Sequence, residues 1–311
     1  MKKRILLIGS SNMDFSMNVC KMPEAGETLI DDGGVAYTPG GKGANAAIAI
    51  SKLGGECIFS TKLGADAHGQ RLFNYYKEVG INTSAIKVDH DHQTGLAVVI
   101  KEGDGQNRII VYPGANAHIT TEAINEAFRY NPDALYLSFE IPFGIAMTAA
   151  KIAASRNIPI FVDPAPAKRE YELENLPPLE IFSPNESETF EYTGINPNCI
   201  ENSLRAALAL YRRVKCKYLV IKLGARGAFL YDGKKYNTFP SMRADKVIDT
   251  TAAGDAFTAA LTVNYLEMGD INEAIRFANA AGALTVSRVG ASVAIPTKAE
   301  VFALLNKQER Y

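Results

Sequence analysis

The stretch RILLIGSSNMD at residues 4–14 indicates the class of fold. Its apolar run is too short for the core of a signal peptide, and polar residues follow at once, as expected of a buried strand that ends in a loop. Similar apolar runs alternate along the chain with longer segments of helical periodicity, which predicts a parallel sheet covered by helices. The predicted strands are 4–8, 57–61, 134–137, 158–162, 181–183 and 218–223, and the predicted helices are 43–53, 69–79, 121–128, 143–156, 186–193, 200–214, 254–268, 271–287 and 298–307.

Two segments, 13–38 and 93–112, break this alternation because they contain strand-like runs without helices between them. In the second segment, TGLAVVIKE, GDG and QNRIIVY predict a β-hairpin, and Asp232-Gly233 predicts another tight hairpin. We expect the two segments to form a small β-layer beside the main sheet, either as a lid over a ligand or as an oligomer contact.

The composition narrows the range of functions. The chain has 311 residues, 47% apolar and 22% charged, which is enough for one large α/β domain. A net charge of −1 gives no general attraction to nucleic acid or to an anionic membrane. The four cysteines follow no metal or disulfide spacing, and no apolar stretch could span a membrane, so we expect free thiols and a cytoplasmic protein.

The segment DTTAAGDAF at 249–257 precedes the apolar helical run 256–266. Small residues at a helix start let the N–H groups of Ala252, Ala253 and Gly254 approach an anion closely. Asp255 falls in the first turn, where its carboxylate could orient a hydroxyl group and accept its proton. An acidic residue that only stabilises the helix start would give the same local pattern.

The segment PGGKGANAA at 39–47 also leads into a helix. Gly41 permits close approach of a ligand, and Lys42 and Asn45 can bind hydroxyl groups. The segment is not a Walker A loop, because Gly43 stands where serine or threonine is required. It contains G-x-G-x-x-A, but the dinucleotide fingerprint directly follows a core strand and this loop does not. A glycine-rich turn without a ligand remains an alternative.

Two further turns follow predicted strands. In PNESE at 184–188, Asn185 and Glu188 lie three positions apart at a helix start, so they could hold magnesium through water or simply cap the helix. In LGARG at 223–227, Gly224 and Gly227 could line a ligand crevice or form an ordinary turn.

Taken in order, GSSNMDF, PEAGET, GGKGANAA, PNESE, KLGARG and DTTAAGDAF resemble the signatures of the ribokinase-like carbohydrate kinase family, over about residues 5–297. The resemblance implies a three-layer αβα domain over 1–311 with a mostly parallel central sheet. It also implies a small β-sheet lid of about 13–38 and 93–112, which is often used for dimerisation. The expected activity is transfer of the γ-phosphoryl group of ATP to a primary hydroxyl of a pentose. GGKGAN is more similar to the ribokinases than to fructokinases or adenosine kinases, so D-ribose is the expected pentose.

The resemblance also implies roles by position. Asn12, Asp14, Gly41, Lys42, Asn45 and Glu140 would bind the sugar, and Asp255 would deprotonate its hydroxyl beside an anion hole of Ala252, Ala253 and Gly254. Asn185, Lys222, Gly224, Gly227 and Asn279 would bind the nucleotide, with Glu188 near Mg²⁺ through water. Lys222 replaces a common threonine, and Asn279 replaces a histidine that often meets adenine.

A K⁺ site is implied as well, with oxygen ligands from Asp249, Thr251, Thr285, Arg288 and Gly290. Ala294 stands where ribokinases tend to offer a serine hydroxyl, and Ser292 is a nearby substitute.

Three other interpretations are separable by experiment. A kinase of the same family for another sugar or a nucleoside would be found with a substrate panel. A nicotinamide-dependent oxidoreductase would bind NAD(P), and a non-catalytic sugar-binding regulator would need neither Asp255 nor the anion hole.

Overall fold

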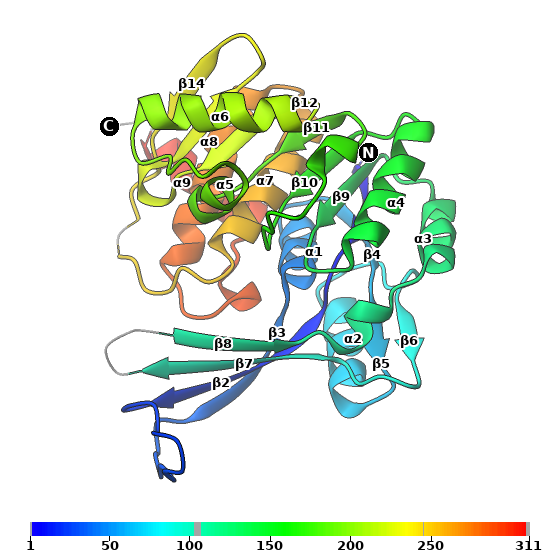
Figure 1. Cartoon of the computed structure of the whole chain (residues 1–311), viewed down its shortest axis with the longest axis vertical. Helices are drawn as coiled ribbons and strands as arrows, with labels where there is room; N and C mark the ends of the chain where they lie inside the picture. The colour runs from blue at the N-terminus through cyan, green and yellow to red at the C-terminus, as the bar shows by residue number, and fades with distance from the viewer. Residues whose placement is uncertain (1, 103–106, 245, 309–311) are drawn as a thin grey trace.

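The main sheet has eight strands in the order β14-β13-β12-β11-β10-β9-β1-β4 in a computed structural model that describes residues 2–102, 107–244 and 246–308 (Figure 1). From β4 to β12 neighbouring strands are parallel, and β13 and β14 add an antiparallel edge. The predicted hairpin at Asp232-Gly233 joins these last two strands. The bounds are β1 (Arg4–Ile8), β4 (Glu56–Ser60), β9 (Ala134–Ser138), β10 (Ile160–Asp163), β11 (Leu179–Phe182), β12 (Cys216–Lys222), β13 (Ala228–Tyr231) and β14 (Tyr236–Phe239).

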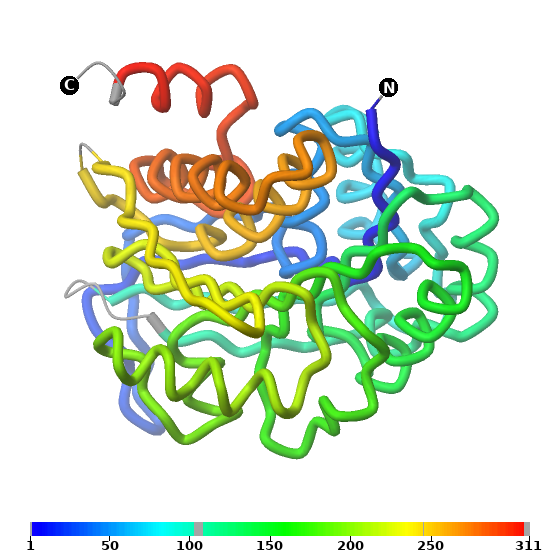
Figure 2. Tube along the Cα trace, turned by 90° about the horizontal axis from the view of Figure 1, so that it is seen from above, coloured from blue at the N-terminus to red at the C-terminus, as the bar shows by residue number. Residues whose placement is uncertain are grey.

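Helices cover both faces of this sheet, as Figure 2 shows, because alternate strand residues point to opposite sides. In β1, Ile5 and Leu7 belong to one buried apolar cluster, and Leu6 and Ile8 belong to the other. The first cluster packs against α1 (Lys42–Lys52), α2 (Ala67–Glu78), α7 (Ala253–Met268), α8 (Ile271–Val286) and α9 (Lys298–Gln308). The second packs against α3 (Thr121–Ala127), α4 (Phe143–Ser155), α5 (Glu186–Thr193) and α6 (Ile200–Arg213). The predicted three-layer αβα architecture is confirmed.

A second sheet of four strands, in the order β3-β2-β7-β8, extends from the main body (Figure 1). It is mixed, because β2 pairs with β7 in parallel and both outer pairs are antiparallel. The predicted hairpin of β7 and β8 is confirmed, although its GDG turn lies outside the described residues. The bounds are β2 (Asn12–Val19), β3 (Val35–Gly40), β7 (Gly95–Glu102) and β8 (Asn107–Tyr112).

The two faces of this lid sheet differ in polarity, as the strand register determines. One face is mostly apolar and carries Phe15, Met17, Val35, Tyr37, Leu96, Val98, Ile100, Ile110 and Tyr112, with the ion pair of Arg108 and Glu102 at its far end. The other carries the polar Asn12, Asp14, Ser16, Thr38 and Lys101, together with the apolar Val99, Ile109 and Val111 near β8. A sheet with one apolar and one polar face can contact a hydrophobic partner and a polar ligand at the same time.

A third, two-stranded sheet was not predicted. Its strands β5 (Lys62–Gly64) and β6 (Lys87–Asp89) have three residues each, which is too short for an alternation pattern to be visible. Short 3-10 helices complete the fold: η1 (Gly114–His118), η2 (Phe128–Tyr130), η3 (Leu173–Asn175), η4 (Gly224–Arg226) and η5 (Ser292–Ala294).

No helix in the described part of the chain is long and apolar enough to cross a bilayer. All four cysteines fall within the described residues and are free thiols, as predicted, with Cys57 and Cys216 buried.

Candidate active site

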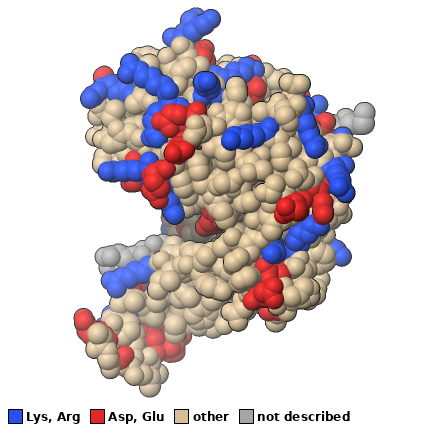
Figure 3. All heavy atoms as spheres, turned by 45° about the vertical axis from the view of Figure 1, so that its right-hand side comes forward, with Lys and Arg blue, Asp and Glu red and all other residues tan. Residues whose placement is uncertain are grey.

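The candidate site lies where the parallel strands of the main sheet end, facing the polar side of the lid sheet. Glu140 follows β9, Asp163 ends β10, and Lys222 ends β12 at this edge. Figure 3 shows a cleft between the main body and the lid sheet, with acidic atoms at its bottom. Open parallel sheets bind ligands beyond the carboxyl ends of their strands, so this cleft is the expected place for a substrate.

Helix α7 begins at this edge. Ala252 precedes it with φ 61°, a left-handed conformation that alanine rarely adopts. Among the described residues no side chain caps the helix. Exposed amide groups in the first turn of a helix attract anions. The N–H of Ala253 already donates to the Thr250 carbonyl at 3.3 Å, and the start of α7 otherwise has the backbone arrangement expected of an anion site at Ala252, Ala253 and Gly254.

Asp255 is buried in the first turn of α7 and contacts two residues of α1. Its Oδ2 accepts a hydrogen bond from Asn45 Nδ2 at 2.8 Å, and Lys42 Nζ lies 3.6 Å from its Oδ1. The charge on Asp255 raises the pKa of the Lys42 ammonium, so this lysine stays protonated. The segments 39–47 and 249–257 thus meet at one carboxylate.

The sugar side of the predicted site contains two more carboxylates. Glu140 accepts hydrogen bonds from the backbone N–H of Lys42, at 2.8 Å, and from the hydroxyl of Ser10. Burial raises the pKa of Asp14 to about 7, with Glu140 and Asp255 adding to the effect. Asp14 Oδ1 and Asn45 Oδ1 are buried without a hydrogen-bond partner. Two acceptors of this kind fit a ligand that offers hydroxyl groups.

The glycines of this region leave room for those polar groups. A Cβ atom at Gly40 would lie 2.0 Å from Asp14 Oδ2, so only glycine fits beside that carboxylate. Gly41, with φ 86°, precedes α1 as its N-cap. Asn12 is held by Asn116, whose Nδ2 donates to Asn12 Oδ1 at 2.8 Å.

Lys222 lies behind the anion site in a buried ion pair. Its Nζ is 2.7 Å from Asp163 Oδ2 and 3.1 Å from Thr258 Oγ1. The same Nζ lies 3.7 Å from the position that a Cβ of Gly254 would occupy. Because Asp163 balances the charge of Lys222, the pair adds a dipole and no net charge beside the helix start.

Asn185 and Glu188 form a capping box at the start of α5. Asn185 Oδ1 accepts from the N–H of Glu188, and Glu188 Oε2 accepts from the N–H of Asn185, each at 2.8 Å. Burial raises the pKa of Glu188, while Lys222 opposes the rise. The capping alternative is therefore observed. Since both Glu188 oxygens already accept hydrogen bonds, this carboxylate fits Mg²⁺ through a water molecule rather than directly.

Gly227 and Asn279 lie against the end of β14 and the segment after it. Gly224 and Gly227 have φ 53° and 87° and form the tight turn after β12. A Cβ at Gly227 would lie 1.9 Å from the carbonyl oxygen of Phe239, and Asn279 Nδ2 donates to the Pro240 carbonyl at 3.0 Å. Gly227 and Asn279 thus share Pro240 as a neighbour, and Gly224 belongs to the same turn as Gly227.

Asp249 precedes α7, and its carboxylate is surrounded by donors. Thr251 donates to Oδ1 from its N–H at 2.9 Å and its hydroxyl at 2.6 Å, and the N–H of Gly290 donates to Oδ2 at 3.2 Å. Lys101 Nζ of the lid sheet lies 3.5 Å from Oδ2. The Thr285 carbonyl accepts from the N–H of Arg288 at 3.2 Å.

Ser292, the nearby substitute for the hydroxyl missing at Ala294, lies against the segment before α1. Its Oγ donates to the Pro39 carbonyl at 3.1 Å. The described residues contain no cluster of three histidine, cysteine, aspartate or glutamate side chains that could bind a metal directly.

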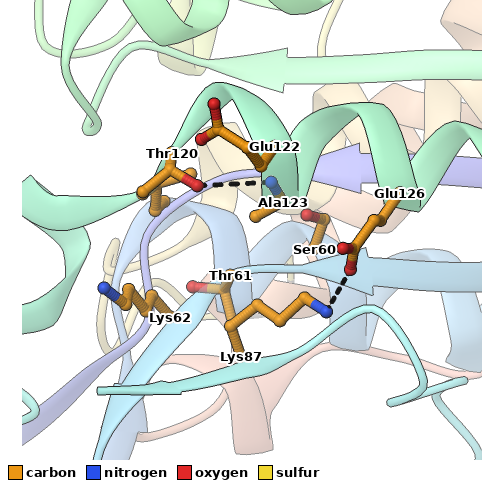
Figure 4. A pocket seen from close by; sticks show the side chains of 9 residues that line it. Ser60, Thr61, Lys62, Lys87, Thr120, Glu122, Ala123 and Glu126 are labelled. Atoms are coloured by element: carbon orange, nitrogen blue, oxygen red, sulfur yellow. Dashed lines mark hydrogen bonds and ion pairs between the residues drawn. The ribbon is translucent and has the colours of Figure 1, made fainter. Parts of the chain in front are cut away.

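A hollow elsewhere, between α3 and the β4–β5 segment, contains none of the predicted residues (Figure 4). Its two lysines are already paired, Lys87 with Glu126 and Lys62 with Asp89. It is therefore a weaker candidate than the cleft.

Sequence reasoning did not single out Asp163, Asn116, Ser10 or Lys101. Asp163 had one usable signal, because it is the only charged residue in the buried run IFVD and stands at its carboxyl end. Asn116 and Lys101 had none, since their partners are more than 100 positions away in the sequence.

Comparison with known proteins decides the family. The pfkB family of carbohydrate kinases matches residues 2–298. The chain belongs to this family. This pfkB-family kinase is 36% identical to the ribokinase of Bacillus subtilis, over 98% of its own length and 100% of that protein. It is 34% identical to the bifunctional ribokinase/ribose-5-phosphate isomerase A of Fructilactobacillus sanfranciscensis, covering 99% of its own length and 57% of that longer protein.

A solved structure of Arabidopsis thaliana ribokinase complexed with ribose and ATP superimposes on the kinase with a TM-score of 0.87, at 31% identity. The match covers 98% of this chain and 99% of the other. Fold and family agree, so the kinase is an ATP-dependent carbohydrate kinase.

The oxidoreductase alternative has no support in the topology, because the G-x-G-x-x-A loop follows β3 of the lid sheet and not a strand of the main sheet.

Proposed function

We propose that this kinase transfers the γ-phosphoryl group of ATP to the primary hydroxyl of a pentose, with D-ribose as the substrate. One observation carries the proposal: Asp255 lies in the first turn of α7, beside the anion site, and contacts Lys42 and Asn45 of the sugar-side loop. The match to ribokinases over nearly the whole chain supports the choice of sugar.

Each group has a role that follows from its position. Asp14 and Glu140 accept hydrogen bonds from sugar hydroxyls, and Asn12, whose Oδ1 is held by Asn116, donates through Nδ2. Asp255 accepts the proton of the reacting hydroxyl as its oxygen bonds to the γ-phosphorus and the bond to the β-phosphate oxygen breaks, releasing ADP. The N–H groups of Ala252, Ala253 and Gly254 hold the transferring group, with the ion pair of Lys222 and Asp163 behind them.

The nucleotide would lie across Asn185, Gly224, Gly227 and Asn279. Mg²⁺, when bound, neutralises phosphate charge, and Glu188 would hold it through water. For K⁺, Asp249 provides the carboxylate, but Lys101 already lies against it. The lid, residues 13–38 and 93–112 of a single domain 1–311, would exclude water when it closes.

The exposed apolar face of the lid sheet supports a homodimer formed through the lid. Val35, Tyr37, Ile110 and Tyr112 on this face are exposed, which is unusual for a contiguous apolar set on a monomer.

The proposed substrate is tested by ADP release with ATP, Mg²⁺ and a panel of D-ribose, other sugars and nucleosides. We expect kcat/KM to be highest for D-ribose. A higher value for a nucleoside or another sugar would replace ribose and keep the kinase. No ADP release with any of them, from folded protein, would contradict catalysis and favour a sugar-binding regulator.

Asp255→Asn tests the chemistry. The amide keeps the shape and loses the proton acceptor, so we expect kcat to fall by about 10²–10⁴-fold, the usual contribution of a general base. Sugar binding and the melting temperature should change little. Near-normal turnover of Asp255→Asn would remove this residue from the base role.

A further inference from the structure

The lid sheet and the loop before α7 are joined by an ion pair. Lys101 Nζ, on β7, lies 3.5 Å from Asp249 Oδ2. The Asp249 side chain is 15% exposed and that of Lys101 is 37% exposed, so water screens the pair only in part. The two residues are 148 positions apart in the sequence, and the contact depends on the placement of the lid.

Lys101 lies on the face of the lid sheet that faces the cleft. Asp14 on β2 pairs with Ala97 on β7, and Lys101 lies four residues further along the same strand. Because strand residues alternate between faces, Asp14 and Lys101 share the polar face. A lid position that brings Asp14 to the sugar therefore also brings Lys101 to Asp249.

Asp249 in turn holds the loop that forms the anion site. It binds Thr251 through Oδ1 and Gly290 through Oδ2, and its own N–H donates to the Val286 carbonyl at 3.3 Å. Ala252, one residue after Thr251, has a left-handed conformation that needs support from its surroundings. A change in the charge beside Asp249 would therefore disturb the backbone that would hold the phosphoryl group.

A free monovalent cation does not fit well beside Asp249 while Lys101 is there. At a separation of about 4 Å, two positive charges repel by roughly 4 kcal/mol at the effective dielectric constant of a protein surface. The position of Ala294 offers no side-chain oxygen. The lysine ammonium already supplies the positive charge that the carboxylate requires.

We propose that Lys101 takes the place of a monovalent cation at Asp249 and so couples closure of the lid to the anion site. Lys101 is a positioning residue, because it acts through Asp249 and the loop and touches no reacting atom. The proposal rests on the proposed function for its activity readout.

Turnover with the sugar that gives the highest rate is measured at fixed ionic strength in choline chloride and in KCl. We expect wild-type turnover in the two salts to agree within about twofold, since no strong coupling to K⁺ is present. Lys101→Met should lose about tenfold in choline chloride, equivalent to about 1.4 kcal/mol, and regain most of it in KCl. Lys101→Arg should keep the wild-type behaviour, and Lys21→Met, at an exposed lid lysine paired with Glu27, serves as the control.

Melting temperature gives a readout that does not need turnover. Because a ligand that binds only the folded state stabilises it, KCl should raise the melting temperature of Lys101→Met above its value in choline chloride and leave the wild type unchanged. Strong activation of the wild type by K⁺ would overturn the proposal. So would full activity of Lys101→Met without K⁺, or a loss that K⁺ does not reverse. If no sugar is phosphorylated, the proposed function fails, whereas the melting comparison still tests the ion pair.

Discussion

Three carboxylates and one ammonium group face the bottom of the cleft: Asp14, Glu140, Asp255 and Lys42. Only Asp255 has the ammonium of Lys42 beside it, at 3.6 Å from Oδ1, and the Asn45 amide donates to its Oδ2. Asp14 is buried and lies near the other two, which raises its pKa to about 7. Groups with such different environments can divide the work, one accepting a proton and the other binding hydroxyl groups.

The raised pKa of Asp14 predicts a pH-dependent cost in stability. A carboxyl group whose pKa is about 7 when folded and 3.8 when unfolded stabilises the fold fully below pH 3.8, and that stability is lost as the pH rises through 7. Asp14→Asn removes the dependence. We expect its free energy of unfolding, relative to wild type, to rise by about 2–3 kcal/mol between pH 5 and pH 8.

Urea denaturation at the two pH values measures this difference. Asp32→Asn, which changes an exposed carboxylate between β2 and β3, is the control and should show no such rise. A constant difference between Asp14→Asn and wild type would mean that Asp14 is ionised throughout.

Sugar KM for the wild type should also fall as the pH rises from 6 to 8, because the ionised carboxylate is the better hydrogen-bond acceptor.

The pair of Asp163 and Lys222 predicts strong coupling between two mutations. Both side chains are more than nine-tenths buried, so removing one partner leaves the other charge without compensation. Asp163→Asn or Lys222→Met alone should lower the free energy of unfolding by about 3–5 kcal/mol. The double mutant should lose much less than the sum, because no charge is left buried. Urea denaturation of the four proteins forms a double-mutant cycle, and additive losses would contradict the pairing.

At this scale the sequence predicted residues that stand in glycine-rich or helix-start motifs. Asp255, Lys42 and Asn45 were predicted separately, and the structure places them in contact. Asp163 and Lys101 were not predicted, because their roles depend on partners that come close only in the folded chain. Ion pairs between distant segments leave no local pattern in a single sequence.

At the scale of elements, the end of β3 determines where Asp14 can lie. Gly40 is the last residue of β3, and a Cβ there would overlap the Asp14 carboxyl group. Gly40→Ala should therefore displace Asp14 and raise the sugar KM about tenfold or more, while the ATP KM stays unchanged. Gly144→Ala, at a position in α4 with open space around it, is the matched control. Equal sugar KM values for the two variants would show that Asp14 does not bind sugar.

Elements with a clear period were predicted to within about two residues, and the short ones were missed. α5 was predicted with its observed ends, because a capping box and an αL glycine at Gly194 mark both. The strand predicted from 158 begins at Ile160, since the N–H of Ile158 instead donates to Ala153 at the end of α4. β5 and β6 are defined only by pairing with each other.

At the scale of the molecule, one face of the lid sheet lies over the cleft and the other is turned away from it. Its polar face carries Asp14 and Lys101 toward the cleft, and its apolar face points the other way. The alternation of β2 was visible in the sequence, but which face met the main sheet was not, because that depends on how the sheet is attached. A partner on the apolar face would fix the lid and so affect both contacts on the polar face.

One charged side chain placed on the apolar face of the lid sheet should weaken a dimer formed through that face. Ile110 is 70% exposed on this face, and a glutamate there would be buried without a partner in a lid-to-lid contact. We expect Ile110→Glu to raise the dimer dissociation constant at least about hundredfold, or roughly 2.7 kcal/mol, in sedimentation measured over a series of concentrations. Met268→Glu, 64% exposed at the end of α7, should leave the dimer intact. The dimer would be contradicted if the wild type stayed monomeric at every concentration, or if Ile110→Glu dimerised as the wild type does. The apolar face would then bind another partner.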